Sequence, residues 1–231
     1  MNICVEGEGQ ALILLHGWGL DHRFMEPVFH YFKNQYRVCM MDLPGFGKSV
    51  PLPHPYTIDD YVNTLINVIQ TYHLENPIFI AHSFGARIVF RYASLYTCKY
   101  MILSGAAGIK TKRNLSYYIK VYTYKICKHL NIHVSLGSQD YRNANEVLRK
   151  TLVKVVNEDL REDICYIKCP MLLVWGENDL QTPLWMAHTI KSLNANASLI
   201  VFEKDDHFAY YHQMQRFLLV CKHALEGCEI Q

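Results

Sequence analysis

Ser83 is the residue of this chain best placed to serve as a nucleophile. It stands in the run AHSFG at 81–85, after a short apolar stretch and before a helix-like one. A serine on a sharp turn from strand to helix needs small residues two positions to either side, because bulky side chains there collide with the neighbouring backbone. Ala81 and Gly85 meet this need. The pattern therefore predicts a nucleophile elbow centred on Ser83.

A base must accept the serine proton, because a serine hydroxyl alone is a weak nucleophile. The chain has twelve histidines, and His207 is the one that lies in a loop directly after the last apolar run, at 197–202. His82 adjoins Ser83, but alternation along an extended chain places it on the opposite side. The other histidines fall in helical stretches, in the middle of the chain or in an early loop. His207 is therefore the predicted base.

A carboxylate must orient that base, and Asp179 is the predicted acid. It follows the apolar run at 171–175, and a carboxylate just past the carboxyl end of a parallel strand faces the crevice where such sheets bind ligands. Glu177 is the alternative acid. A turn or helix-start role is the structural alternative for Asp179, because the segment leading to Pro183 also permits it.

The developing oxyanion needs hydrogen-bond donors, and the run HGWG at 16–19 follows the first strong apolar stretch. Its glycines allow the loop to bend close to Ser83. We expect the backbone N–H groups of Trp18 and Phe84 to form an oxyanion hole. His16 is interpreted as structural, because the chemistry requires only one base.

The elements that must position these residues alternate along the chain. Short apolar runs that suit strands buried on both faces occur at 11–15, 36–41, 78–81, 100–104, 171–175 and 197–202. Helical patterns occur at 21–33, 57–73, 85–96, 183–193 and 210–225. This alternation predicts an α/β fold, with a mostly parallel central sheet flanked by helices.

One stretch breaks the alternation and is interpreted as a helical cap insertion at 108–168, within a single domain covering 1–231. It has no convincing strand, and 114–130 and 143–160 are expected to be helical. Its first part is basic and rich in tyrosine, with no acidic residue among Lys110, Lys112, Arg113, Lys120, Lys125 and Lys128. A solvated helix face is the favoured interpretation. The alternative is a docking face for an anionic carrier or substrate.

Composition narrows the class of protein. The chain has 231 residues, half of them hydrophobic, and a net charge of +2, so it is expected to be globular and nothing global points to nucleic acid. The eight cysteines form no CxxC pair, which disfavours a zinc site and favours reduced thiols in a cytoplasmic protein. No apolar run is long enough for a membrane span. The run GFGKS at 45–49 is no phosphate loop, because position 42 is Asp42 instead of glycine.

Taken together, these motifs resemble the α/β-hydrolase family. The matching runs are HGWG at 16–19, DLPGFGKS at 42–49, HSFG at 82–85, WGEND at 175–179 and the late His207. The resemblance implies a Ser83–His207–Asp179 triad that needs no metal or organic cofactor. Within the family the chain is most similar to small cytosolic esterases, among them the pimeloyl-carrier-protein methyl ester esterases of biotin synthesis.

Two departures from the family pattern stand close to the proposed site. Ala81 occupies a position where the family usually has glycine, and Asp205 and Asp206 precede His207 where it usually has small residues. The extra carboxylates make the surroundings of His207 a point to test.

The leading hypothesis is a serine hydrolase that cleaves a carboxylic ester or thioester through an acyl-enzyme. Two alternatives stay open. One is a carbon–carbon bond hydrolase or lyase that uses the same triad. The other is a hydrolase fold that serves as a binding protein without turnover.

Overall fold

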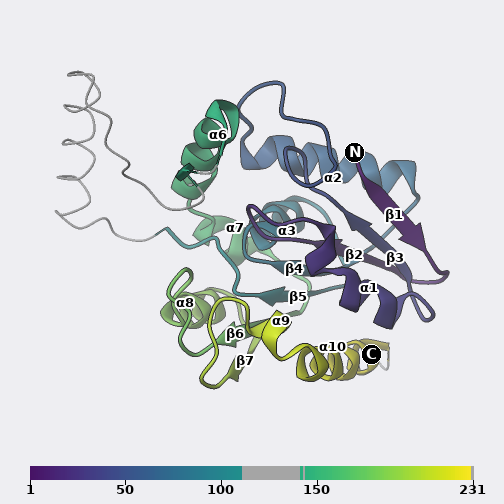
Figure 1. The fold of residues 1–231 in the computed structure, drawn as a ribbon. Coiled ribbons are helices and arrows are strands. Elements are labelled where there is room, and N and C mark those ends of the chain that lie inside the picture. Colours follow the sequence, from purple (N-terminus) through teal and green to yellow (C-terminus); the bar gives the residue numbers. More distant parts are fainter. Residues whose placement is uncertain (111–140, 143, 230–231) are drawn as a thin grey trace.

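A seven-stranded sheet forms the centre of the computed structural model, which describes residues 1–110, 141–142 and 144–229 (Figure 1). The strands are β1 (Ile3–Glu6), β2 (Ala11–Leu15), β3 (Arg37–Met41), β4 (Ile78–His82), β5 (Tyr100–Ser104), β6 (Met171–Gly176) and β7 (Ala197–Phe202). Their order across the sheet is β1-β3-β2-β4-β5-β6-β7, and every neighbouring pair except β1–β3 is parallel. The predicted α/β fold with a mostly parallel sheet is confirmed.

The six predicted strands are confirmed to within one residue at each end. β1 was not predicted, and it pairs antiparallel to β3, with Ile3 opposite Met41. Because β1 lies at the sheet edge and is only partly buried, it lacks the continuous apolar run that identifies a strand covered on both faces.

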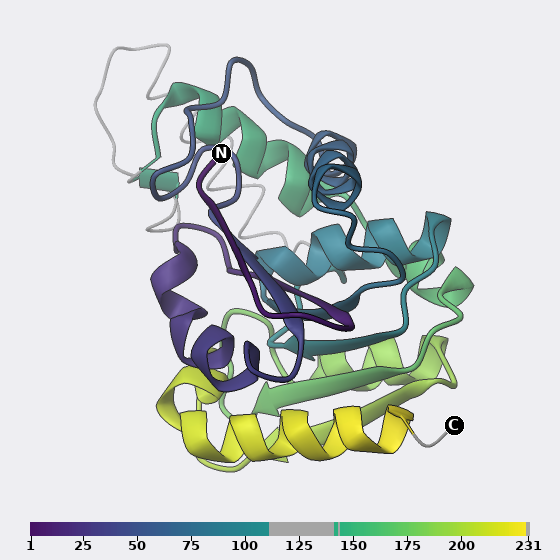
Figure 2. The same cartoon turned by 90° about the vertical axis from the view of Figure 1, so that its right-hand side faces the viewer.

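Two layers of helices cover the sheet (Figure 2). The helices are η1 (a 3₁₀ turn, His22–Phe24), α1 (Glu26–Phe32), α2 (Ile58–Thr71), α3 (Phe84–Leu95), α6 (Glu146–Asn157), α7 (Arg161–Tyr166), α8 (Trp185–Leu193), α9 (Ala209–His212) and α10 (Met214–Glu229). In β2, Leu12 and Leu14 pack with the residues of α1 and α10, whereas Ile13 and Leu15 pack with those of α2, α3 and α8. This period of two explains why the strands are apolar throughout.

The predicted helix at 143–160 corresponds to α6, which is shorter, and a further short helix, α7, begins at Arg161. At the end of α6 the backbone of Glu158 is extended, and Arg87 of α3 donates from Nη1 to the carbonyls of Val155 (2.6 Å) and Glu158 (3.1 Å). The guanidinium therefore takes over carbonyls that a continuing helix would have used. The predicted helix at 114–130 lies outside the described residues, so the cap insertion at 108–168 stays a prediction.

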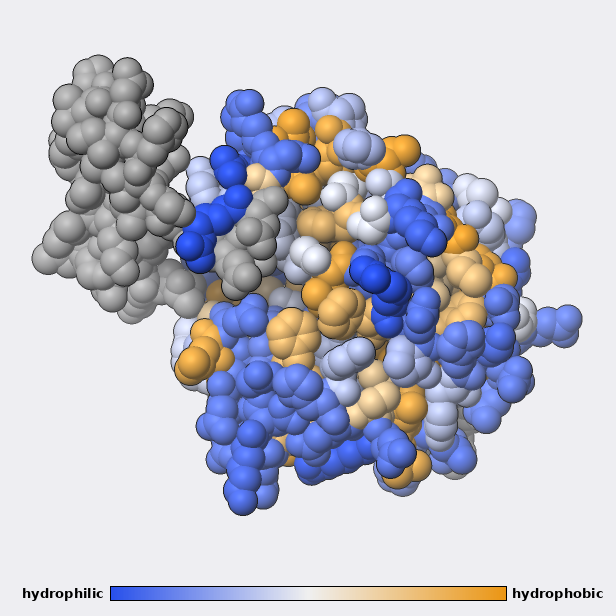
Figure 3. All heavy atoms as spheres, in the orientation of Figure 1, coloured by the Kyte–Doolittle hydropathy of each residue, from blue (hydrophilic) through white to orange (hydrophobic). Residues whose placement is uncertain are grey.

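The surface is mixed in character. On the face seen in Figure 1, hydrophobic residues show in the middle and hydrophilic residues dominate the rim (Figure 3). Within the described part of the chain, no helix combines the length and the apolar character that crossing a membrane requires. The cytoplasmic location stays a prediction.

Candidate active site

Ser83 occupies a sharp turn between β4 and α3. Its φ of 50° and ψ of −106° are strained values for a residue with a side chain, as a nucleophile elbow requires. A Cβ on Gly85 would lie 2.7 Å from the carbonyl oxygen of Leu15 and 2.9 Å from that of His16, so only glycine fits there. Ala81 is buried within β4 beside Leu15, where the strand accommodates the methyl group.

The loops after β4, β6 and β7 bring Ser83, Asp179 and His207 together. His207 Nε2 lies 2.9 Å from Ser83 Oγ, and His207 Nδ1 lies 2.7 Å from Asp179 Oδ2. Because a carboxylate oxygen only accepts, the proton of the neutral imidazole is on Nδ1, and Nε2 is free to accept from the serine hydroxyl. His207 and Asp179 are buried, at 5% and 2% exposure. Water therefore competes little for these hydrogen bonds.

Asp179 is held in place by its own turn. Its Oδ1 accepts from the backbone N–H groups of Gln181 and Thr182, both at 2.8 Å. Glu177, the alternative acid, is exposed, and its Oε2 accepts from Lys204 N at 2.9 Å. The structure therefore brings Asp179, and not Glu177, to the predicted base.

Two residues at this site were not predicted from the sequence. Thr182 Oγ1 lies 2.8 Å from Asp179 Oδ2, 3.1 Å from the carbonyl oxygen of Gly105 and 3.2 Å from His207 Nδ1. Gly105 has a φ of 52°, and a Cβ there would lie 3.0 Å from His207 Nδ1. Gly105 could have been identified by its position directly after the apolar run at 100–104. Thr182 could have been identified by its spacing of three residues from Asp179.

His82 lies closer to the site than alternation along the strand suggested. Its ring centroid is 4.7 Å from that of His207, and its Nδ1 donates to the carbonyl of Ser104 at 3.1 Å. Burial, and after it the neighbouring His207, lower the pKa of His82 well below its usual value. His82 is therefore a neutral ring that packs against the predicted base.

The loop at 16–19 lies against the elbow. His16 is fully buried; its Nδ1 donates to the carbonyl of Gly17 (2.7 Å), and its Nε2 accepts from Leu43 N (2.9 Å). A Cβ on Gly17 would lie 2.8 Å from His82 Cδ2, and the Trp18 and Phe84 rings meet edge to face at 5.1 Å. These contacts agree with a structural role for His16. The oxyanion hole of Trp18 and Phe84 stays a prediction.

The two carboxylates before His207 turn away from it. Asp205 accepts from His212 Nδ1 at 2.8 Å and from Gln213 Nε2 at 2.9 Å, and Asp206 accepts from Phe208 N at 2.8 Å. Asp206 therefore holds the start of α9, and Asp205 holds its end and the residue before α10. Among the described residues, neither makes a hydrogen bond or an ion pair with His207.

Two groups of side chains have the residue types of a metal site. They are Asp21, His22 and Asp42, and Asp205, Asp206 and His212. In the first group Asp42 already accepts from the backbone N–H groups of His22 and Lys48, and the second is largely exposed. Hydrogen bonds within the fold account for both groups, and the expectation that no cofactor is needed stays a prediction.

Comparison with known proteins links the fold to a family. A family model described as alpha/beta hydrolase fold matches residues 10–120. The chain is 27% identical to the AB hydrolase superfamily protein YisY of Bacillus subtilis, over 91% of this chain and 89% of that protein. It is 25% identical to a pimeloyl-[acyl-carrier protein] methyl ester esterase of Shewanella woodyi, over 92% of each chain.

A solved structure shows the same fold. The meta-cleavage product hydrolase of Pseudomonas fluorescens superposes with a TM-score of 0.76 at 22% identity, over 98% of this chain and 94% of that one. The α/β-hydrolase fold is supported by the family model, by the curated relatives and by the sheet with its flanking helices. The chain therefore has the α/β-hydrolase fold, its sequence is similar to proteins of that family, and it is an enzyme.

Proposed function

We propose that the chain is a serine hydrolase that cleaves a carboxylic ester or thioester. The observation that carries the proposal is the unbroken hydrogen-bonded path from Asp179 Oδ2 through His207 to Ser83 Oγ, with steps of 2.7 and 2.9 Å. These distances lie within the reach required for a base to take the proton of a nucleophile.

In the proposed mechanism, Ser83 Oγ attacks the substrate carbonyl while His207 Nε2 takes the hydroxyl proton. Asp179 stabilises the imidazolium that forms, and the N–H groups of Trp18 and Phe84 donate to the oxyanion. His207 then donates the proton to the departing alcohol or thiol, which leaves the acyl group on Ser83. A water molecule, deprotonated by His207, releases the acid.

The substrate class is proposed from the relatives. Several of them are named pimeloyl-[acyl-carrier protein] methyl ester esterases, which supports a small ester linked to a carrier protein. The basic residues that would attract an anionic carrier lie mostly at 112–128, outside the described residues. The likeness to a carbon–carbon bond hydrolase is one of fold at 22% identity, so ester cleavage is the favoured chemistry.

A p-nitrophenyl ester series of increasing acyl length tests the proposal. We expect hydrolysis of at least one ester, with an initial burst of p-nitrophenol as the acyl-enzyme accumulates. A fluorophosphonate probe should label Ser83, as identified by peptide mass spectrometry. The matched control is Ser192→Ala, which removes an exposed serine hydroxyl elsewhere on the protein. Absence of both turnover and labelling in folded protein would favour the binding-protein alternative.

A further inference from the structure

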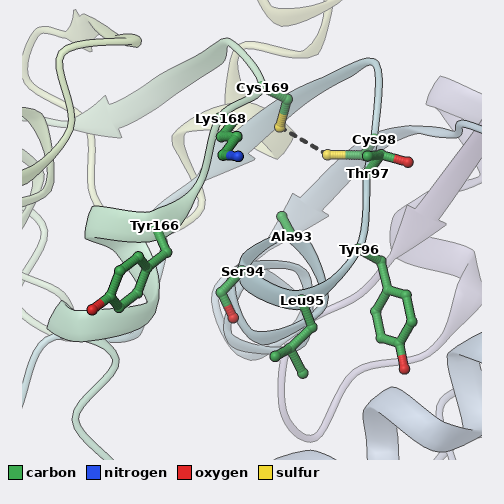
Figure 4. Close-up of a pocket in the computed structure, with 9 residues that line it drawn as sticks. All are labelled: Ala93, Ser94, Leu95, Tyr96, Thr97, Cys98, Tyr166, Lys168 and Cys169. Carbon is green, nitrogen blue, oxygen red and sulfur yellow. Dashed lines mark hydrogen bonds between the residues drawn. The ribbon is translucent and has the colours of Figure 1, made fainter.

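Two cysteines meet at the amino-terminal ends of β5 and β6, opposite the strand ends that carry the candidate active site. Cys98 precedes β5 and Cys169 precedes β6, and these two strands are parallel neighbours, with Met101 opposite Met171. Because Ser83 lies at the carboxyl ends of the strands, the cysteines lie at the other end. Their side chains point toward one another across a surface pocket (Figure 4).

The two sulfur atoms are close enough to react. Cys98 Sγ lies 2.8 Å from Cys169 Sγ, although the residues are 71 positions apart in the sequence. A disulfide bond is about 2.05 Å long, so a movement of less than about 1 Å joins the sulfurs. Among the described residues, no other pair of cysteine sulfurs lies within hydrogen-bond distance.

The pair is asymmetric, as an attacking thiol and its resolving partner are. Cys98 is buried at 7% exposure, whereas Cys169 is partly exposed. The hydrogen bond between the thiols lowers the pKa of Cys169 and, together with burial, raises that of Cys98. Cys169 is thus the sulfur with more thiolate character and better access.

The pocket gives a small oxidant a route to this sulfur. It has a volume of about 370 Å³ and is lined by residues 93–98 together with Tyr166, Lys168 and Cys169. Lys168 places a cationic side chain on the wall next to Cys169 (Figure 4), which suits an anionic peptide disulfide.

We propose that Cys98 and Cys169 form a reversible intramolecular disulfide, with a glutathione-type disulfide as the oxidant. The Cys169 thiolate attacks one sulfur of the oxidant and expels the first glutathione thiolate, which takes up the proton that Cys169 released. The Cys98 thiol then attacks Cys169 Sγ of the mixed disulfide and expels the second glutathione, which takes the Cys98 proton. The two cysteines lose two electrons, and one oxidised glutathione becomes two reduced molecules.

The bond closes a loop that contains β5, α6 and α7. A cross-link across so long a segment stabilises mainly by restricting the unfolded chain. We expect oxidation to raise the melting temperature by about 10 °C. The thiols lie at the amino ends of the strands and Ser83 lies at the carboxyl ends. The rate of ester hydrolysis should therefore change less than about twofold, and it is measured separately.

The experiment incubates the full-length protein with oxidised glutathione, then alkylates the remaining thiols and measures the intact mass. Wild type should lose two alkylation sites without gaining glutathione, and peptide mapping should find a Cys98–Cys169 cross-link. Cys165→Ser is the matched control, because Cys165 is an exposed cysteine only four residues from Cys169. It should behave as wild type.

Cys98→Ser removes the resolving thiol, so one glutathione should stay on Cys169 and the melting temperature should not rise. The peptide map of the wild type needs no variant, and it keeps the test decisive if Cys98→Ser does not fold. Wild type that retains all its thiols, or cross-links that involve Cys165 instead, would overturn the proposal. Dithiothreitol should restore both lost sites, and a cross-link that it does not reverse would also contradict it.

Discussion

Two of the histidine–aspartate pairs among the described residues are alike in geometry but differ in what surrounds them. Asp42 follows β3 and Asp179 follows β6, so both acids lie just past the carboxyl end of a parallel strand. His22 Nδ1 lies 2.8 Å from Asp42 Oδ1, and His207 Nδ1 lies 2.7 Å from Asp179 Oδ2. The pairs are therefore almost the same in length and in the ring nitrogen used.

The two pairs differ in what the second ring nitrogen, Nε2, faces. His207 Nε2 faces the hydroxyl of Ser83 at 2.9 Å, whereas His22 Nε2 lies 3.6 Å from the carboxylate of Glu26. His207 is also more deeply buried, with 5% of its side chain exposed against 18% for His22. An imidazole can act as a base only toward a group that has a proton to give.

Asp42 serves the fold. Burial by itself would raise its pKa, but the backbone N–H groups of Lys48 and His22 and the side chain of Asn2 lower the pKa of Asp42 to about 2. A Cβ on Gly47 would lie 2.4 Å from Asp42 Cγ, so the loop is closed tightly around the carboxylate. A histidine–aspartate pair therefore has a structural role unless the second ring nitrogen of its histidine faces a nucleophile.

Removal of the nucleophile should have the largest effect. We expect Ser83→Ala to lower kcat for ester hydrolysis on the order of a millionfold, because a triad works as a unit. The melting temperature should change little, since alanine keeps the Cβ and therefore the same backbone strain. Steady-state kinetics and thermal unfolding measure the two effects. Activity within tenfold of wild type, with contaminating esterase excluded, would contradict the assignment of Ser83.

The two aspartates should respond in opposite ways. Asp179→Asn should lower kcat by roughly 10⁴-fold, because a neutral amide neither fixes the tautomer of His207 nor stabilises its protonated ring. Asp42→Asn should leave kcat within about tenfold but destabilise the protein by about 2–4 kcal/mol, because its buried hydrogen bonds are lost. Kinetics and urea unfolding of both variants test this, with the exposed Glu177→Gln as control. A crippled Glu177→Gln enzyme beside an active Asp179→Asn enzyme would reassign the acid.

Thr182 should have a smaller effect, on positioning. Its hydroxyl contacts both Asp179 Oδ2 and His207 Nδ1. We expect Thr182→Val to lower kcat about tenfold with little change in KM, and Thr182→Ser to restore most of the loss, because serine keeps the hydroxyl. The pH dependence of kcat should shift in the valine variant only. Equal kinetics for the wild type and both variants would mean that Thr182 contributes only to packing.

The buried histidines should give the protein a stability that depends on pH. Burial lowers the pKa of His16 and, more strongly, that of His82 below 6.5. Below about pH 6.5 the unfolded chain takes up protons that the folded protein does not, so the free energy of unfolding should fall by up to about 1.4 kcal/mol per pH unit for each histidine. Urea unfolding between pH 8 and 5 measures this slope, and His82→Gln should reduce it. An unchanged slope would mean that His82 does not contribute.

Much of the site could be predicted from the sequence, because its signals are local. A serine between an apolar run and a helical one, with Gly85 two residues later, identifies the elbow by steric exclusion alone. The alternation of apolar runs and helical patterns places His207 in the loop after the last strand. The same logic located six of the seven strands, and it missed β1, because an edge strand has no buried second face.

The tertiary structure decided what local patterns could not. Asp179 and Glu177 are two residues apart and both follow β6, and only the folded chain shows which carboxylate reaches His207. The contacts of Thr182 with that histidine and with Gly105, and the approach of Cys98 to Cys169, join segments far apart in sequence. Such contacts depend on the register of neighbouring strands and on the paths of their loops. These are set by the packing of the whole core, which no single segment encodes.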